Sequence, residues 1–391
     1  MFILIFACLV SSIFIFSFGA LFYSLFFRHL ENNAEVENIG VFGVIFLSFI
    51  TLLINFFIPI NKLVGTILTL FSILYFLLFY FKSLKKKEII FFILASSFIS
   101  FFLVVFSNIN RPDAGLYHLP YVGILHDNKV IFGLSNLHFR YGHISLLQYL
   151  SASHYNYFLK LEFINIAMST TASFFFYFLF KNYYRSIKKK DGFLFFFIFL
   201  LLVFSLYAFN RYSNYGNDAI SHFYFFILSI LFLKIENLRK IKNHEFFQIS
   251  FISIFLFALK PFMIFLILFP LIIFIINKKK LKFVFDKNTL ICLVFIFSWI
   301  IKNIITSGCA IYPVTATCFS NLHYFDKDKT EEVALMGELW AKDIPNNKKY
   351  KSFEEFNTKF NWVNVWKDNH FKVIIKKLLP YLIFLFLLLI M

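Results

Sequence analysis

Apolar residues fill this chain in long runs, and short polar or basic stretches separate the runs. Nearly all of the runs are about 17 residues or longer, and a helix of about 20 apolar residues crosses the ~30 Å hydrocarbon core of a membrane. The pattern predicts an all-α protein, a polytopic transmembrane helix bundle with ~11 spans. The predicted spans are 3–25, 40–58, 65–81, 89–107, 161–180, 192–209, 218–234, 247–259, 261–277, 289–306 and 374–391.

The composition excludes an ordinary soluble domain. Of 391 residues, 60% are hydrophobic and only 15% are charged, and a soluble protein of this length does not hide that much apolar surface. The net charge is +17, but the lysines and arginines form short clusters between the apolar runs. Such clusters are typical of membrane-protein loops. We therefore expect membrane lipids as partners and no nucleic acid.

The basic loops predict the orientation of the chain. The loops 82–88, 181–191, 234–245 and 278–288 carry eighteen lysines and arginines, whereas the connections at 59–64, 210–217 and 260 carry one each. Because basic loops stay in the cytoplasm, the N-terminus is predicted outside. We interpret residues 1–391 as a single membrane domain. Its two long outer connections are 108–160, which would hold interfacial helices, and 307–373, an outer loop or lid.

Three local features qualify this arrangement. The first 27 residues lack a basic start and a small-residue cleavage pattern, so they read as a retained helix rather than a signal peptide. Pro261 disfavours helix at Lys260, so two short helices are expected to meet at a break there. Cys309 and Cys318 share one outer connection and could form a disulfide, or could both be free thiols.

The first outer connection begins with an unusually polar stretch, "RPDAGLYHLP", at residues 111–120. On a helix that starts near Asp113, this residue and Tyr117 lie one turn apart on one face. We expect an amphipathic helix in the membrane interface, bent or broken at Pro120. A simpler interpretation is that Asp113 only caps the helix, because Asp is a favoured N-terminal cap.

Further along the same connection, His138, Arg140 and His143 are candidates for binding an anionic group, since the planar guanidinium of arginine suits that task. They could equally be solvated loop residues. The five histidines of this connection fit no zinc-binding spacing. No metal ligand is therefore assigned and no cofactor is certain, although a divalent metal is possible.

A second polar cluster, "NRYSNYGNDAI" at 210–220, is predicted on the same outer side. Arg211, Asn217 and Asp218 surround the flexible Gly216, and Asp218 opens an apolar span where it could also be a helix cap. Lys260 belongs to the next connection predicted on this side. Charges at membrane depth are costly, so these residues are candidates for substrate binding.

Several function classes lack their sequence signatures. The chain has no G-x-x-x-x-G-K-[ST] motif for ATP, no G-x-G-x-x-G motif for a dinucleotide and no H-E-x-x-H motif for a zinc protease. Acidic residues are scarce inside the predicted spans, which argues against an ion-coupled transporter.

The spacing of Asp113, Tyr117, His118 and Pro120 (D-x-x-x-Y-H-L-P) resembles the outer loop of the membrane-embedded GT-C glycosyltransferases. The stretches 113–151, "YGND" at 215–218 and "SGCAIYP" at 307–313 more closely resemble a group of bacterial multi-pass membrane proteins. The resemblance implies a GT-C-like fold in the bacterial inner (plasma) membrane and a polyprenyl-phosphate-linked sugar donor. Asp113 corresponds to the family's loop aspartate and becomes the catalytic candidate. Two departures are that this chain has no paired acid beside Asp113, and that four spans precede the loop instead of one.

The expected function is therefore the transfer of a sugar from a lipid-linked donor to a cell-surface glycan, lipid or protein acceptor. Asp113 would take the proton of the acceptor hydroxyl as a general base. The cationic side chains of Arg140, Arg211 and Lys260 would stabilise the leaving phosphate, while Tyr117 and His118 would bind substrate. The alternatives are a transporter or flippase for lipid-linked saccharides, or a polysaccharide polymerase or ligase that uses 307–373.

Overall fold

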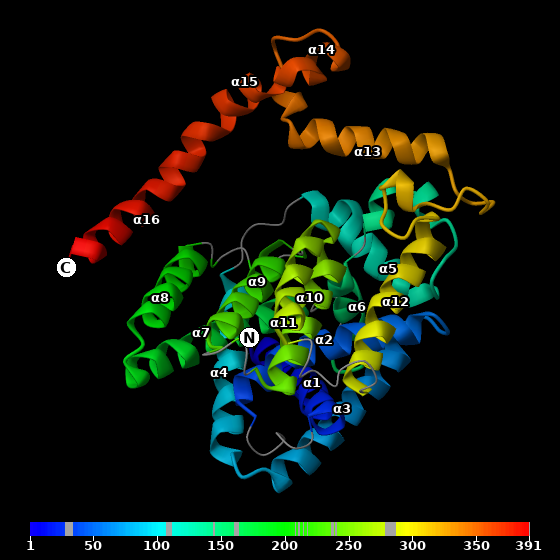
Figure 1. The fold of residues 1–391 in the computed structure, drawn as a ribbon. Helices are drawn as coiled ribbons and strands as arrows, with labels where there is room; N and C mark the ends of the chain where they lie inside the picture. The colour runs from blue at the N-terminus through cyan, green and yellow to red at the C-terminus, as the bar shows by residue number, and fades with distance from the viewer. Residues whose placement is uncertain are drawn as a thin grey trace. The chain divides into compact units, whose positions relative to one another are not determined.

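The computed structural model describes residues 1–27, 34–106, 112–143, 145–159, 164–207, 209, 212–213, 215–216, 218–235, 238, 241–277 and 287–390. Within these ranges the chain is all-helical and has no β-strand, only an isolated bridge between Cys309 and Cys318. It forms two compact units, Met1–Thr306 (unit 1) and Ser307–Met391 (unit 2) (Figure 1). Each is described by itself.

Unit 1 contains the helices that precede the Ser307 boundary. They are α1 (Phe2–Phe26), α2 (Val36–Asn55), α3 (Lys62–Lys82), α4 (Lys86–Val105), η2 (Ala114–His118), α5 (Leu119–Asp127), η3 (Leu134–Asn136), η4 (Phe139–His143), α6 (Leu146–Ser153), α7 (Ile166–Lys189), α8 (Gly192–Tyr207), α9 (Asp218–Leu233), α10 (Asn243–Leu259), η8 (Pro261–Ile267), α11 (Leu268–Asn277) and α12 (Lys287–Ser307).

Unit 2 contains shorter helices and one long apolar helix at the end. They are η10 (Thr315–Thr317), α13 (Lys327–Ala341), η11 (Ile344–Asn346), α14 (Phe353–Asn357), η12 (Thr358–Phe360), α15 (Trp362–Trp366), η13 (Lys367–Phe371) and α16 (Lys372–Ile390). A small core of Leu339, Phe356 and Val365 holds the shorter helices together. The disulfide Cys309–Cys318 closes a loop near the start of this unit.

The predicted all-α class is confirmed, and each of the eleven predicted apolar runs coincides with a helix. Among the described residues, α1, α2, α3, α4 and α12 are long and apolar enough to cross a membrane, and α8, α9, α10 and η8–α11 are shorter apolar helices. Several boundaries differ from the prediction by a few residues, and two of the extensions carry charged residues. Helix α2 starts earlier, at Val36, and α7 continues to Lys189. Hydrophobicity misses both extensions because they carry charged residues whose partners come from other helices.

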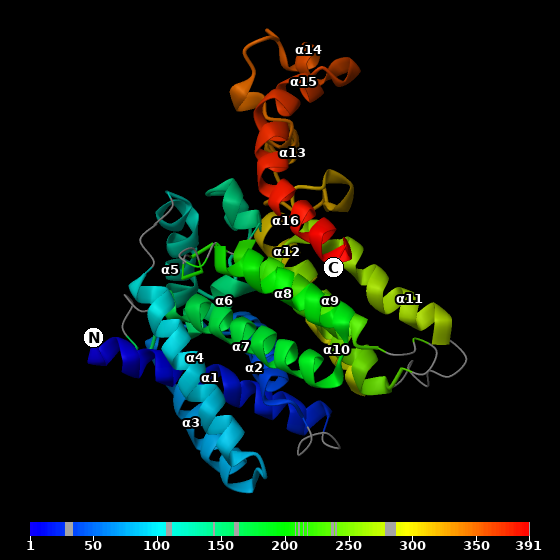
Figure 2. The same ribbon diagram turned by 90° about the vertical axis from the view of Figure 1, so that its left-hand side faces the viewer.

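The centre of unit 1 is formed by α1, α2 and α7. In α2, 83% of the apolar stretch is buried, against 33% in α3. Glycines let α1 and α2 approach closely, because a Cβ atom at Gly19 would lie 1.8 Å from the carbonyl oxygen of Ile39 and one at Gly43 would lie 2.1 Å from that of Ile15. Small residues at such crossings are typical of membrane helices, whose association depends on packing and hydrogen bonds. Helix α7 packs along α4 and α2 (Figure 2).

Buried hydroxyl groups and one histidine link the helices α1, α4, α6 and α7. Ser11 of α1 lies 2.9 Å from Nε2 of His154 and 2.8 Å from the hydroxyl of Thr170 on α7. Ser100 of α4 contacts Ser169 of α7 at 2.7 Å. The other ring nitrogen of His154 lies 2.8 Å from the carbonyl oxygen of Leu150 in α6, to which it donates. The histidine is therefore a structural residue, and its hydrogen bonds join α6 to the bundle.

Chain segments predicted for the same side of the membrane contact one another. At one end of unit 1, Lys85 donates to the carbonyl oxygen of Ala34 at 2.8 Å. At the other end, the amide of Val130 donates to the carbonyl oxygen of Asn55 at 3.1 Å, and the amide of Gly133 donates to that of Ile305 at 2.9 Å. The described part of 112–159 thus lies against the ends of α2 and α12.

Candidate functional site

The polar stretch after α4 forms a continuous helical segment. The turn Ala114–His118 is a π-helix and leads directly into α5. The sequence predicts a helix bent or broken at Pro120. Of these two forms the break is wrong, because the helix passes the proline in the first turn of α5. A proline cannot donate an amide hydrogen bond and crowds the preceding turn, and the wider π-turn just before it accommodates both effects.

Asp113 lies at the start of this segment with an exposed side chain. Its carboxylate makes no capping hydrogen bond to the π-turn. It instead interacts with the hydroxyl of Tyr117. Burial, and then the negative charge of Asp113, raise the pKa of the Tyr117 hydroxyl. The carboxylate therefore acts on a tyrosine one turn away, as the shared helix face predicted, and it makes no capping hydrogen bond.

Arg140 reaches this pair from η4. Its guanidinium lies 5.1 Å from the ring centroid of Tyr117 and 5.1 Å from that of Phe139. The backbone amide of Arg140 donates to Nδ1 of His138 at 3.2 Å, so this nitrogen of His138 accepts a bond from the loop and helps to hold Arg140 in place. His143 ends η4 with an exposed side chain.

The second polar cluster contributes an ion pair between two helices. Asp218, the first residue of α9, pairs with Lys260. Lys260 lies at the expected break between α10 and η8, with an extended backbone (φ −146°) before Pro261. The break is confirmed. Arg211 and Asn217, the other candidates of this cluster, lie outside the described residues.

His118 connects the two clusters. The charges that act on its ring are those of Asp113, Asp218, Arg140 and Lys260, so the two polar segments, which are remote in sequence, lie within electrostatic range of one histidine. Burial is the largest effect and lowers the pKa of His118 to about 4. The imidazole is consequently neutral at pH 7. Gln148 of α6 lies 2.7 Å from its Nδ1, a partner that the sequence pattern did not single out.

This arrangement has a defined chemistry. It combines two carboxylates, two cations and a neutral imidazole at one end of unit 1. The cations can bind an anion, and an exposed carboxylate can accept a proton. Among the described residues, no three side chains of His, Cys, Asp or Glu are grouped so that they could hold a metal ion.

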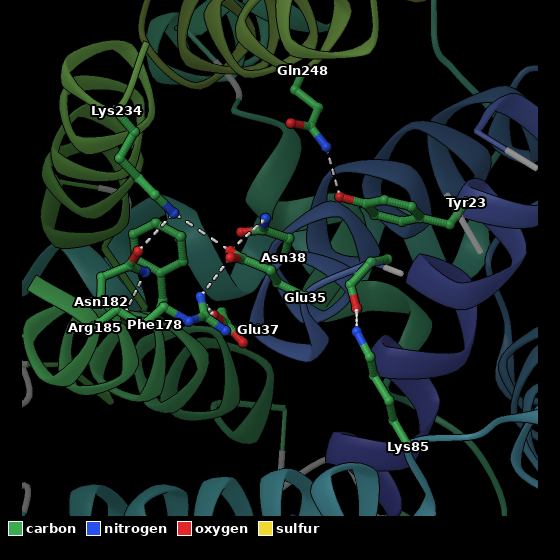
Figure 3. A network of polar contacts seen from close by, with 11 residues as sticks. Tyr23, Glu35, Glu37, Asn38, Lys85, Phe178, Asn182, Arg185, Lys234 and Gln248 are labelled. Carbon is green, nitrogen blue, oxygen red and sulfur yellow. Dashed lines mark hydrogen bonds and ion pairs between the residues drawn. The ribbon is translucent and has the colours of Figure 1, made fainter. Parts of the chain in front are cut away.

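Sequence reasoning also missed a second charged network (Figure 3). It lies at the end of unit 1 where α2 begins. Arg185 of α7 pairs with the buried Glu37 of α2, and with Glu35 at 2.8 Å. Lys234 lies 3.5 Å from Glu35 and donates to Asn182 at 3.0 Å. The only sequence signal was the pair of acidic residues just before an apolar run. The two negative and two positive charges of these four side chains sum to zero. Their contacts join the start of α2 to α7 and to the residue that follows α9.

Comparisons with known proteins give a family without a described activity. No curated protein matches the chain, and no solved structure matches it. One family matches residues 1–391, which is the whole chain. The chain belongs to this family, described as "Domain of unknown function (DUF8201)".

Proposed function

We propose that the protein is a membrane glycosyltransferase that moves a sugar from a polyprenyl-phosphate-linked donor to a cell-surface glycan, lipid or protein. In this proposal about 11 helices span the bacterial inner membrane in a GT-C-like arrangement, with the N-terminus outside. The segment η2–α5–α6 then lies at the outer interface, where a donor carried by a lipid can reach it. A divalent metal is not required by the residues that we assign.

The observation that carries the proposal is the setting of Asp113. Its carboxylate is exposed, makes no capping bond and interacts with the hydroxyl of Tyr117 one turn away. A carboxylate in this setting can take the proton from an acceptor hydroxyl as that oxygen attacks the anomeric carbon. The bond from the anomeric carbon to the phosphate oxygen breaks in the same step, and the phosphate leaves as an anion.

Two cations are available for that anion. The guanidinium of Arg140 lies 5.1 Å from the Tyr117 ring centroid, Lys260 pairs with Asp218, and both positive charges act on His118. Fixed charges aimed at developing negative charge lower the barrier, because they need no rearrangement during the reaction. The cations therefore support a phosphate leaving group, and the exposed carboxylate supports the activation of a hydroxyl group.

The test replaces Asp113 with asparagine. Asp113→Asn keeps the shape and the capping ability of the residue but removes the base, and removal of a general base typically costs about 10²–10⁴ in rate. The measurement is transfer of radiolabelled sugar in membranes that contain matched amounts of each protein. Asp127→Asn is the matched control, because Asp127 is an exposed acid at the far end of α5.

The two interpretations of Asp113 separate clearly in this assay. Asparagine keeps the size of aspartate but cannot accept the proton, so near-normal transfer by Asp113→Asn would contradict the catalytic assignment. Asp218→Asn, tested alongside, should weaken transfer by releasing Lys260. We expect Asp127→Asn to transfer sugar at the rate of the unaltered protein.

A further inference from the structure

The hydrogen bond between Gln148 and His118 joins two buried polar side chains beneath the charged cluster. Gln148 is 3% exposed and His118 is 6% exposed. Gln148 comes from the first turn of α6, and His118 is the last residue of the π-turn before α5. Helices α5 and α6 pack against each other, so the two side chains are held by the fold rather than by a loop. The amide nitrogen of Gln148 lies 2.7 Å from Nδ1 of the ring.

This contact determines where the imidazole carries its proton. An amide N–H only donates, so Nδ1 must accept, and a neutral ring then has its proton on Nε2. With the amide nitrogen toward His118, the buried amide oxygen of Gln148 makes no hydrogen bond to the described residues. In the opposite orientation the oxygen would face the histidine, and the two N–H donors would take that buried position without partners. Buried donors without partners are rarer than buried oxygens without partners. The orientation with the amide nitrogen toward the histidine is therefore favoured.

The remaining ring nitrogen, Nε2, is available to a ligand. His118 has no hydrogen bond to the described residues other than that to Gln148. The charged groups that face the ring are the carboxylates of Asp113 and Asp218 and the cations Arg140 and Lys260. The two negative and two positive charges sum to zero, and a neutral His118 leaves this sum unchanged. A positive imidazolium beside Asp113 would make its carboxylate a weaker base, because a neighbouring cation favours the charged form.

We propose that Gln148 is a positioning residue that holds His118 as a neutral N–H donor, which binds an oxygen of the substrate through Nε2 beside Asp113. The identity of that oxygen, on the lipid-linked sugar or on its acceptor, rests on the proposed function. The geometry of the Gln148–His118 pair does not. Burial keeps the ring uncharged although two carboxylates act on it, and the amide donor of Gln148 is compatible with this state because it offers no acceptor to a protonated Nδ1.

The first experiment measures the titration of His118 directly. Hydrogen–deuterium exchange at C2 of each histidine, read by mass spectrometry across pH in the purified full chain, gives the pKa of each ring. We expect the midpoint of His118 near the value of about 4 that burial produces. Gln148→Glu supplies a carboxylate to Nδ1–H and should raise this midpoint by about one to three pH units.

Two controls keep the experiment decisive. Gln148→Met removes the hydrogen bond without adding charge, so the midpoint of His118 should stay low. Gln248→Glu adds the same charge at the other end of unit 1, where Gln248 donates to the hydroxyl of Tyr23 at 2.8 Å, and should leave His118 unchanged. An unaltered protein in which His118 titrates near 6.5, or a Gln148→Glu variant with an unshifted midpoint, would overturn the proposed pair.

The second experiment tests the donor role through the pH profile of sugar transfer. In the unaltered protein the neutral ring carries Nε2–H. His118 should therefore cause no loss of transfer as the pH rises. In Gln148→Glu the neutral ring has its proton on Nδ1, so Nε2 donates only while the ring is protonated. Transfer by this variant should therefore fall as the pH rises through its raised midpoint.

The outcomes of the two experiments are separable. Gln148→Glu with the pH profile of the unaltered protein would contradict the donor role. Absence of sugar transfer in the unaltered protein would contradict the proposed function, whereas the exchange experiment would still decide the Gln148–His118 pair. A low midpoint that rises in Gln148→Glu, together with the new alkaline loss of transfer, supports the inference.

Discussion

Removing the positive charge of Arg185 should strongly destabilise unit 1. Glu37 is 1% exposed and its ion-pair partner is Arg185, which also contacts Glu35. Arg185→Gln would leave a carboxylate buried without its compensating charge. Breaking a buried ion pair by removing one partner typically costs about 3–5 kcal/mol. With roughly 2–4 °C of melting temperature for each kcal/mol in larger domains, the expected decrease is on the order of 10 °C.

The assay is the midpoint of thermal unfolding of the purified chain in detergent, followed by the loss of the monodisperse size-exclusion peak. Lys188→Gln is the matched control, because Lys188 is an exposed residue one turn further along α7 and loses the same charge. Such surface changes usually stay within about 0.5 kcal/mol.

A double variant separates charge from packing. Arg185→Met combined with Glu37→Gln removes both charges of the buried pair, and replacing a whole buried pair is often neutral. We expect this variant to recover most of the stability lost in Arg185→Gln. Equal melting temperatures for Arg185→Gln and Lys188→Gln would refute the reasoning, because they would show that Glu37 does not need its partner.

The remaining predictions concern topology, the disulfide and helix packing. A cysteine at Lys188 should resist a membrane-impermeant thiol reagent in intact cells and one at Lys348 should react. The described free cysteines are buried, so the background is low, and the reverse pattern would overturn the orientation. The disulfide of unit 2 should appear as a linked peptide in a non-reducing digest, and free thiols in protein from an oxidising compartment would contradict it. Gly43→Ala places a Cβ atom 2.1 Å from a backbone carbonyl oxygen, so it should destabilise the bundle by about 1–3 kcal/mol or more. Gly123→Ala, which meets no atom within 4 Å, should show no comparable loss of folded protein by size-exclusion.

The helices were predictable because each apolar run carries its own signal. Period and length identify a membrane helix without reference to its neighbours, and the eleven runs correspond to helices for this reason. The extended backbone at Lys260 was also local, since a proline restricts the residue before it. The π-turn before Pro120 was not predicted, because a helix passes a proline only when its surroundings support the altered hydrogen bonds.

The candidate site was predictable in its composition but not in its arrangement. The pairing of Asp113 with Tyr117 follows from helical spacing alone. Whether Asp113 is a cap depends on the direction of its side chain, which spacing does not specify, and the structure shows no capping bond. The role of Gln148 was invisible in sequence, because a glutamine between Leu147 and Tyr149 resembles any polar position on a helix.

The sequence by itself determined the all-α class, the positions of the apolar helices and the identity of the charged residues near Asp113 and Asp218. These properties depend on local hydrophobicity and on residue type. Only the tertiary structure decided that Asp218 and Lys260 act on the same histidine as Asp113 and Arg140, and that Glu37 is buried against Arg185. Contacts between residues far apart in the chain depend on how the helices pack, and the hydrophobic pattern of each helix specifies which residues are apolar but not which neighbouring helix they face.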